Sequence, residues 1–270
     1  MKVDNGWTPG GDHDDLGCMR QEEIWDVDAA RTYDTPGSGM FAADVLEPTV
    51  ERLAALAEGG RALEFAVGTG RVAIPLAERG VPVTGIELSS AMIDQLRTKV
   101  EETVVPVVAG NMATAQAPGE YALVYLVYNT ITNLLRQDEQ VACFRNAARH
   151  LTPGGRFVVE LGVPDLRTLP PGQQAVVFGV RPGYLGLDTY DVLNQRVVSH
   201  HVYFDENNAA RLFRSPHRYI WPTELDLMAQ LAGFELESRH QDWTGREFTG
   251  ESTAHVSVYR LPLPDDAPIS

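Results

Sequence analysis

Three residues at the ends of two short apolar runs have the types and spacing of a nucleoside-binding site. Gly68 and Gly70 follow the first run, Ala73 completes the pattern G-x-G-x-x-A, and Glu87 ends the second run. A glycine turn lets a ligand lie against main-chain N–H groups, and the helix start behind it favours an anionic group. A carboxylate at the end of the second strand can accept hydrogen bonds from both ribose hydroxyls. The spacing therefore predicts a nucleoside-binding half-site.

The elements that must position these residues follow from hydrophobic periodicity. Apolar runs predict strands over 62–67 and 81–86, separated by a helix that carries Val72, Ala73, Leu76 and Ala77. Ser89 is expected to cap the next helix, and Thr223 a later one. Further helices are expected over 21–31, 45–57 and 141–151, and further strands over 104–109, 121–127, 156–161, 234–243 and 252–261. Alternating strands and helices predict a parallel sheet covered on both faces.

The glycine turn alone is shared by two classes of cofactor-binding enzyme. The segments LEFAVGTGR, GIELS, GNM, VYNT and LTPGGRFVVE, in this order, resemble the motifs of class I S-adenosylmethionine-dependent methyltransferases over residues 60–162. The resemblance implies an α/β, Rossmann-like fold with a seven-stranded sheet. It also implies S-adenosylmethionine as cofactor and S-adenosylhomocysteine as product.

The same resemblance implies roles for individual residues. Glu64 would lie near the methionyl amino group, Gly68 and Gly70 beside the methionyl moiety, and Glu87 on the ribose. Ala66 stands where the family has a glycine, and Asn111 where it has an acid for the adenine amino group. The other expected cofactor contacts are Tyr33, Leu88, Met92, Met112, Tyr128 and Asn129. Structural roles stay open for four of these residues: packing at a helix edge for Tyr33, core packing for Met92, a turn for Asn111 and a loop cap for Asn129.

From residue 164 the alternation of helix and strand patterns ends. Prolines follow, together with β-prone runs at 175–180, 196–204 and 211–221. We expect an antiparallel β flap inserted after the fifth strand, of the kind that forms the substrate pocket in the resembled family. His201 shares its more polar face with Ser199 and Tyr203 and is the candidate general base, with a solvated or structural histidine as the alternative. His200 is expected to pack or hydrogen-bond in the core. The expected substrate contacts are Thr130, Glu160, His201 and Tyr203, and an acidic substrate group could instead meet Arg211, Arg214, His217 and Arg218.

The composition narrows the function classes. The 270 residues carry a net charge of -15 without a basic patch, which disfavours nucleic acid as a partner. Two cysteines, Cys18 in a polar tail and Cys143 on an apolar helix face, suggest neither a disulfide framework nor a metal site. No apolar run is long enough for a membrane span and the N-terminus does not resemble a signal peptide, so a cytoplasmic protein is expected. A homodimer is left open.

The expected organisation is a tail (1–20), a cofactor-binding core with an N-terminal cap (21–163), the flap (164–221) and completion of the sheet (222–262). The predicted function is methyl transfer to a small-molecule acceptor, such as a secondary metabolite in antibiotic biosynthesis or an amino sugar. Two alternatives are an NAD(P)-dependent oxidoreductase and a non-catalytic protein that binds S-adenosylmethionine.

Overall fold

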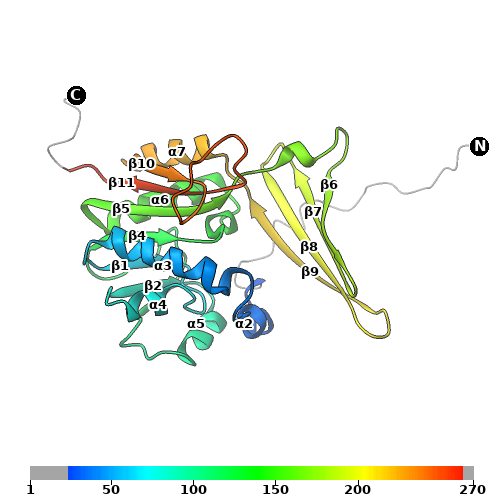
Figure 1. Cartoon of the computed structure of the whole chain (residues 1–270), viewed down its shortest axis with the longest axis horizontal. Helices are drawn as coiled ribbons and strands as arrows, with labels where there is room; N and C mark the ends of the chain where they lie inside the picture. Colours follow the sequence, from blue (N-terminus) through cyan, green and yellow to red (C-terminus); the bar gives the residue numbers. More distant parts are fainter. Residues whose placement is uncertain (1–23, 264–270) are drawn as a thin grey trace, which may run out of the picture.

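Two sheets organise the computed structural model, which describes residues 24–263. The first sheet has the strand order β10-β11-β5-β4-β1-β2-β3 (Figure 1). Its strands are β1 (Ala62–Phe65), β2 (Val83–Glu87), β3 (Val107–Ala109), β4 (Tyr121–Leu126), β5 (Leu151–Gly162), β10 (Glu235–His240) and β11 (Ala254–Arg260). The second sheet, which we call the flap, is antiparallel with the order β6-β7-β8-β9. Its strands are β6 (Ala175–Arg181), β7 (Tyr184–Asp191), β8 (Arg196–Phe204) and β9 (Ala210–Arg218). The predicted fold class is confirmed.

The strand order creates the place where a ligand can bind. β1 pairs in parallel with β2 on one side and β4 on the other. The chain runs outward from β1 through β2 to β3 and then crosses back to β4, so the loops after β1 and β4 diverge. Open parallel sheets bind ligands at such a switch point, beyond the carboxyl ends of the strands.

Helices cover both faces of the seven-stranded sheet. They are α2 (Val27–Tyr33), α3 (Ala43–Ala57), α4 (Ala73–Glu78), α5 (Ser90–Arg97), α6 (Gln137–His150) and α7 (Pro222–Leu231), and the short helices η2 (Gly39–Phe41), η3 (Thr130–Asn133) and η4 (Leu166–Thr168) join them. Alternation along β4 divides the core. Leu123 and Tyr125 pack in the cluster that contains α3, α4 and α5, whereas Val124 and Leu126 pack in the cluster of α6 and α7. None of the helices within 24–263 is long and apolar enough to span a bilayer.

Three local predictions need correction. The strand β7 was not predicted, because Gly186 and Asp188 interrupt its alternation of apolar residues. The cap of α7 is Trp221 instead of Thr223, since Pro222 occupies the first helical position, where a missing N–H costs nothing. The third strand begins only at Val107, after Pro106. The predicted tail and Cys18 lie outside the described residues.

Candidate active site

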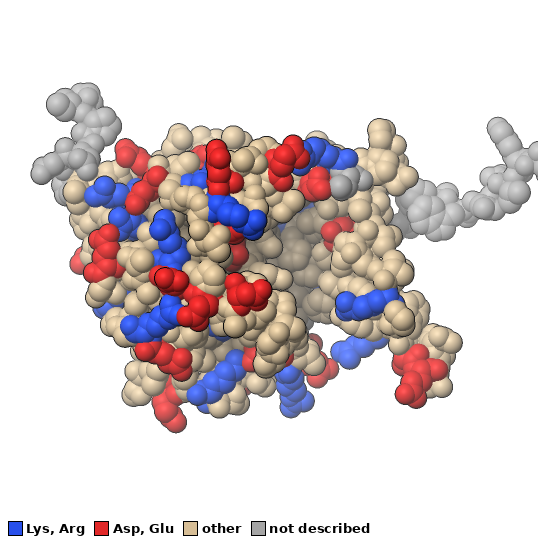
Figure 2. Space-filling model, in the orientation of Figure 1, with Lys and Arg blue, Asp and Glu red and all other residues tan. Residues whose placement is uncertain are grey.

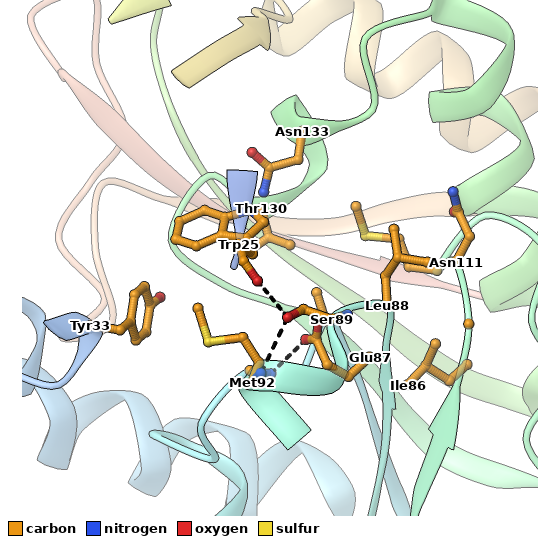
Figure 3. Close-up of a pocket in the computed structure, with 14 residues that line it drawn as sticks. Trp25, Tyr33, Ile86, Glu87, Leu88, Ser89, Met92, Asn111, Thr130 and Asn133 are labelled. Atoms are coloured by element: carbon orange, nitrogen blue, oxygen red, sulfur yellow. Dashed lines mark hydrogen bonds between the residues drawn. The ribbon is translucent and has the colours of Figure 1, made fainter. Parts of the chain in front are cut away.

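A narrow pocket of about 70 Å³ lies at the carboxyl ends of β1, β2 and β3 (Figure 3). It is lined by Trp25, Tyr33, Ala66, Gly68, Ile86, Glu87, Leu88, Ser89, Met92, Gly110, Asn111, Met112, Thr130 and Asn133. The fold thus brings together nine predicted site residues from segments distant in sequence. Four predicted cofactor contacts, Glu64, Gly70, Tyr128 and Asn129, are not among the described residues that line it.

The Glu87 carboxylate is held in place by two backbone donors. Its Oε2 accepts from the N–H of Gly68, and its Oε1 accepts from the N–H of Ser89, both at 2.8 Å. Burial raises the pKa of Glu87, while these N–H groups oppose the shift. Each oxygen keeps a further lone pair, and the side chain lines the pocket. The arrangement can accept two hydrogen bonds from a diol.

The turn after β1 takes left-handed backbone angles at three positions. Gly68 and Gly70 have φ of 56° and 82°, and Ala66 has a φ of 52°, which is strained for a residue with a side chain. A Cβ on Gly70 would lie 2.3 Å from Leu96 Cδ1, so Gly70 faces the packing against α5. Gly68 borders the pocket instead.

Glu64 lies beneath this turn, buried with 3% of its surface exposed. Its Oε2 accepts a hydrogen bond of 3.0 Å from the Tyr125 hydroxyl. Burial raises the pKa of Glu64 to about 8, so the side chain is largely protonated at neutral pH in the unliganded protein.

Asn111 lines the pocket and also makes a hydrogen bond within its own turn. The Asn111 Oδ1 accepts from the Ala113 N–H at 2.8 Å, so the side chain closes a turn as well as lining the pocket. Met92 and Met112 also line the pocket and are nearly buried. At Met92 the predicted cap of α5 is present, since Ser89 Oγ accepts from its N–H at 3.2 Å.

The segment 25–34 borders the pocket and is tied to the loops that follow β1 and β2. Ser89 Oγ donates to the Trp25 carbonyl at 2.6 Å (Figure 3), and Thr69 Oγ1 donates to Asp34 Oδ1 at 2.6 Å. Tyr33 packs edge-on against Trp25, and burial raises the pKa of its phenol to about 12. Trp25 was missed as a site residue, because its sequence context indicated only a short helix.

The turn after β4 is strained, and β5 holds it. Tyr128 and Asn129 have φ of 55° and 63°. The Tyr128 N–H donates to Glu160 Oε2 at 2.8 Å, and the Gly162 N–H donates to Asn129 Oδ1 at 2.6 Å. These contacts give Glu160 and Asn129 a structural task, and Glu160 is not among the described residues that line either cavity.

A second cavity of about 550 Å³ lies between the seven-stranded sheet and the flap. Figure 2 shows a recess between these two parts, with walls mostly of uncharged side chains. Both cavities are bordered by Trp25, Tyr33, Thr130 and Asn133. The other residues that line the second are Met40, Tyr128, Asn129, Thr132, Leu161, Gly162, Val163, Pro164, Asp165, Asp188, Tyr190, Val197, Ser199, His201, Phe213, Ser215, His217, Tyr219 and Ile220.

The more polar face of β8 turns toward this cavity, which places His201 in its wall. His201 Nδ1 lies 2.8 Å from the Tyr184 hydroxyl, and burial lowers the pKa of His201, which keeps the ring neutral at neutral pH. Tyr203 lies further along the strand, 47% exposed, and is not among the described lining residues. His200 lies on the opposite face and pairs with Thr189 Oγ1 at 2.9 Å.

Of the four basic residues proposed for an acidic substrate group, only His217 lines the cavity. Arg218 is buried and pairs with Glu224 at 2.7 Å, which anchors β9 to α7. Arg211 is exposed near Asp28, and Arg214 stands opposite His200 in the register, on the face away from the cavity. The arginines therefore do not contribute to the described lining of the cavity, and Arg211 and Arg214 fit the alternative of an ordinary charged strand face.

Comparison with known proteins distinguishes the cofactor classes. Residues 62–155 match the methyltransferase domain family. The CcbJ methyltransferase from Streptomyces caelestis is 40% identical, with a TM-score of 0.73 over 80% of this chain and 88% of that chain. The chain belongs to the class I S-adenosylmethionine-dependent methyltransferases. S-adenosylmethionine is thus the cofactor of this methyltransferase, and the oxidoreductase alternative is wrong.

Two further similarities concern this methyltransferase. It is 27% identical over 258 residues to the cypemycin N-terminal methyltransferase of a Streptomyces species, which covers 89% of this chain and 98% of that protein. The fold also resembles S-adenosylmethionine-bound CalS10, an amino pentose methyltransferase from Micromonospora echinaspora, with 22% identity and a TM-score of 0.63 over 83% of this chain and 92% of that chain. The enzyme class predicted from the ordered motifs is confirmed.

Proposed function

We propose that this methyltransferase methylates the nitrogen of a small-molecule amine, such as the amino group of a secondary metabolite or an amino sugar. The observation that carries the proposal is the wall shared by the two cavities at Trp25, Tyr33, Thr130 and Asn133. A methyl donor in the narrow pocket and an acceptor in the wide one would meet at this wall. The acceptor named for the cypemycin enzyme is an N-terminus, which supports nitrogen as the acceptor atom.

The groups around the narrow pocket fit the cofactor. Glu87 would accept from the two ribose hydroxyls. The Glu64 carboxyl beneath the glycine turn would lose its proton and pair with the ammonium group. Leu88, Met92 and Met112 form an apolar surface for the adenine ring. The pocket is smaller than the several hundred cubic ångströms of typical cofactor sites, so we infer that segment 25–34 moves aside to admit the cofactor.

The bound cofactor supplies a methyl group on a sulfonium sulfur, which is an excellent leaving group. The chain mainly has to orient the acceptor and exclude water. His201 is proposed to remove the proton that the amine must lose. This role requires the tautomer in which Nδ1–H donates to the Tyr184 oxygen, since Nε2 then has a free lone pair for the proton.

The test is a methyl-transfer assay with radiolabelled S-adenosylmethionine and matched panels of amines, alcohols and carboxylic acids. We expect transfer to amines, and transfer only to oxygen acceptors would refute the proposal. His201→Gln should lower turnover at least tenfold at neutral pH, with the affinity for S-adenosylhomocysteine unchanged. His240→Gln, a histidine outside both cavities, is the matched control. Full activity of His201→Gln on the best amine would eliminate the base role.

A further inference from the structure

The charge of the wide cavity is one-sided. Its described lining contains two carboxylates, Asp165 and Asp188, and neither a lysine nor an arginine. Six aromatic residues also line it: Trp25, Tyr33, Tyr128, Tyr190, Phe213 and Tyr219. Aromatic faces and carboxylates both attract cations, and they repel or fail to pair an anionic group. The cavity therefore has the chemistry of a site for an organic cation.

Asp188 is the better placed of the two carboxylates. It lies on β7, an inner strand of the flap, directly opposite Ser199 on β8. Ser199 Oγ donates to Asp188 Oδ1 at 2.7 Å, and the Tyr190 hydroxyl also forms a hydrogen bond with this carboxylate. These neutral donors fix the orientation of the side chain, and they leave its charge uncompensated.

The surroundings of Asp188 lack a permanent counter-ion. Among the ion pairs within residues 24–263, none involves Asp188. Burial raises the pKa of Asp188, and the nearby His201 and His200 oppose this shift only weakly. Burial also lowers the pKa of both histidine rings, so they carry little charge at neutral pH. Removing a carboxylate from water is costly unless it is paired, and a ligand that fills the cavity would remove Asp188 further from water. A cationic ligand would supply the missing charge.

We propose that Asp188 is the anionic anchor of the acceptor site and binds an ammonium group of the substrate. Tyr190 and Tyr219, whose ring centres are 6.4 Å apart, and Phe213 provide aromatic surface beside it. His201 stands in the same wall, two residues along β8 from Ser199. A substrate held by Asp188 therefore lies in the same cavity as the proposed base. This inference rests on the proposed function. It adds that the substrate binds as a cation.

The alternative is that Asp188 only stabilises the flap through Ser199. A structural carboxylate would not discriminate between ligands by charge. The discriminating measurement is therefore the preference for a cationic over a neutral ligand of the same shape.

The probes are phenethylamine, phenethyl alcohol and 3-phenylpropionate, which differ chiefly in the charge of the end group. Binding is measured by calorimetry at pH 7.5 on the full chain with S-adenosylhomocysteine present. We expect the wild type to bind the amine at least tenfold more tightly than the alcohol, and the acid most weakly. Asp188→Asn should remove the preference for the amine and leave the affinity for the alcohol unchanged. Asp188→Glu should restore part of it.

Glu206→Gln, which removes an exposed carboxylate at the β8–β9 hairpin, is the matched control and should retain the wild-type preference. Equal binding of amine and alcohol by the wild type, absence of amine binding, or a preference that survives in Asp188→Asn would overturn the inference.

The failure of this inference can be distinguished from the failure of the proposed function. Methyl transfer to amines that is indifferent to Asp188 removes the anchor and leaves N-methylation intact, whereas transfer only to oxygen acceptors removes N-methylation itself.

Discussion

The protonation of Glu64 tests how strongly burial shifts a pKa beneath the cofactor pocket. Its pKa is raised from 4.5 to about 8, mainly by burial. Between these two pH values the folded protein keeps a proton that the unfolded chain releases. The contribution of Glu64 to the free energy of unfolding is therefore fully present below pH 4.5, falls as the pH rises and is lost above about pH 8.

The magnitude follows from the size of the shift. One pH unit corresponds to about 1.4 kcal/mol, so the whole interval amounts to about 5 kcal/mol. Glu64→Gln keeps an oxygen acceptor for the Tyr125 hydroxyl and cannot ionise. The free energy of unfolding of the variant, minus that of the wild type, should rise by about 1.4 kcal/mol per pH unit between pH 5 and 8.

Urea unfolding of both proteins at half-unit pH steps measures this difference. Glu235→Gln, which changes an exposed glutamate on β10, is the control and should show a flat difference. A flat difference for Glu64→Gln as well would show that Glu64 is ionised in the folded protein, and the reasoning from burial would be refuted.

Cofactor binding is expected to release a proton from the same carboxyl group. If the ammonium group of S-adenosylmethionine lies near Glu64, it lowers the pKa of the carboxyl, and the complex releases up to one proton at pH 7 and none well above pH 8. Calorimetry in buffers of different ionisation enthalpy counts these protons. Wild-type binding without proton release at pH 7 would place the ammonium elsewhere.

Two further predictions concern the same pocket. Glu87→Ala should weaken binding of S-adenosylmethionine by about 2 kcal/mol, because two hydrogen bonds from ribose to a charged acceptor are lost. Calorimetric titration measures this change, and an unchanged affinity would contradict the role of Glu87. Ala66→Gly should raise the free energy of unfolding by about 1 kcal/mol, because glycine relieves the left-handed strain at φ 52° and only part of this gain is offset by the greater freedom of the unfolded chain. Urea unfolding tests it, and a destabilised variant would show that the turn is not strained.

The cofactor half of the molecule could be predicted because local sequence determines it. A glycine turn, an acid at the end of the next strand and Ser89 as a helix cap all act within a few residues of the elements they terminate. Parallel strands then bring these ends to one edge of the sheet without any further information. Prediction failed where the position depends on packing: Gly70 faces Leu96, and the Glu64 carboxyl lies beneath the turn. Neither residue lines the pocket, nor do Tyr128 and Asn129, whereas Trp25 does and was not predicted.

The acceptor half depends on contacts that a linear pattern does not contain. β7 carries Asp188, and two residues break its pattern: Gly186, where a Cβ would lie 2.4 Å from the Phe178 ring, and Asp188, which lines the cavity. Tyr203 has the right alternation but lies beyond the cavity, because the strand is longer than the cavity wall. Glu160 has a suitable type and position, yet one of its carboxylate oxygens accepts from the backbone N–H of Tyr128 in the turn after β4. Whether such a side chain lines the cavity therefore depends on strand register and on distances across strands.

The two halves are joined by a hydrogen-bond chain whose direction can be worked out. Thr132 Oγ1 donates its only hydrogen to the Asn129 carbonyl at 2.7 Å, so His217 Nδ1, 3.1 Å away, must donate to Thr132. His217 Nε2 then accepts from Ser215 Oγ at 2.9 Å. This chain needs a neutral ring, and burial supplies one by lowering the pKa of His217 to about 4. The flap is therefore tied, at neutral pH, to the strained turn at Tyr128 and Asn129, which borders the wide cavity and leads into Thr130 at the wall shared by both cavities. This tie keeps the acceptor wall in a fixed relation to the cofactor pocket.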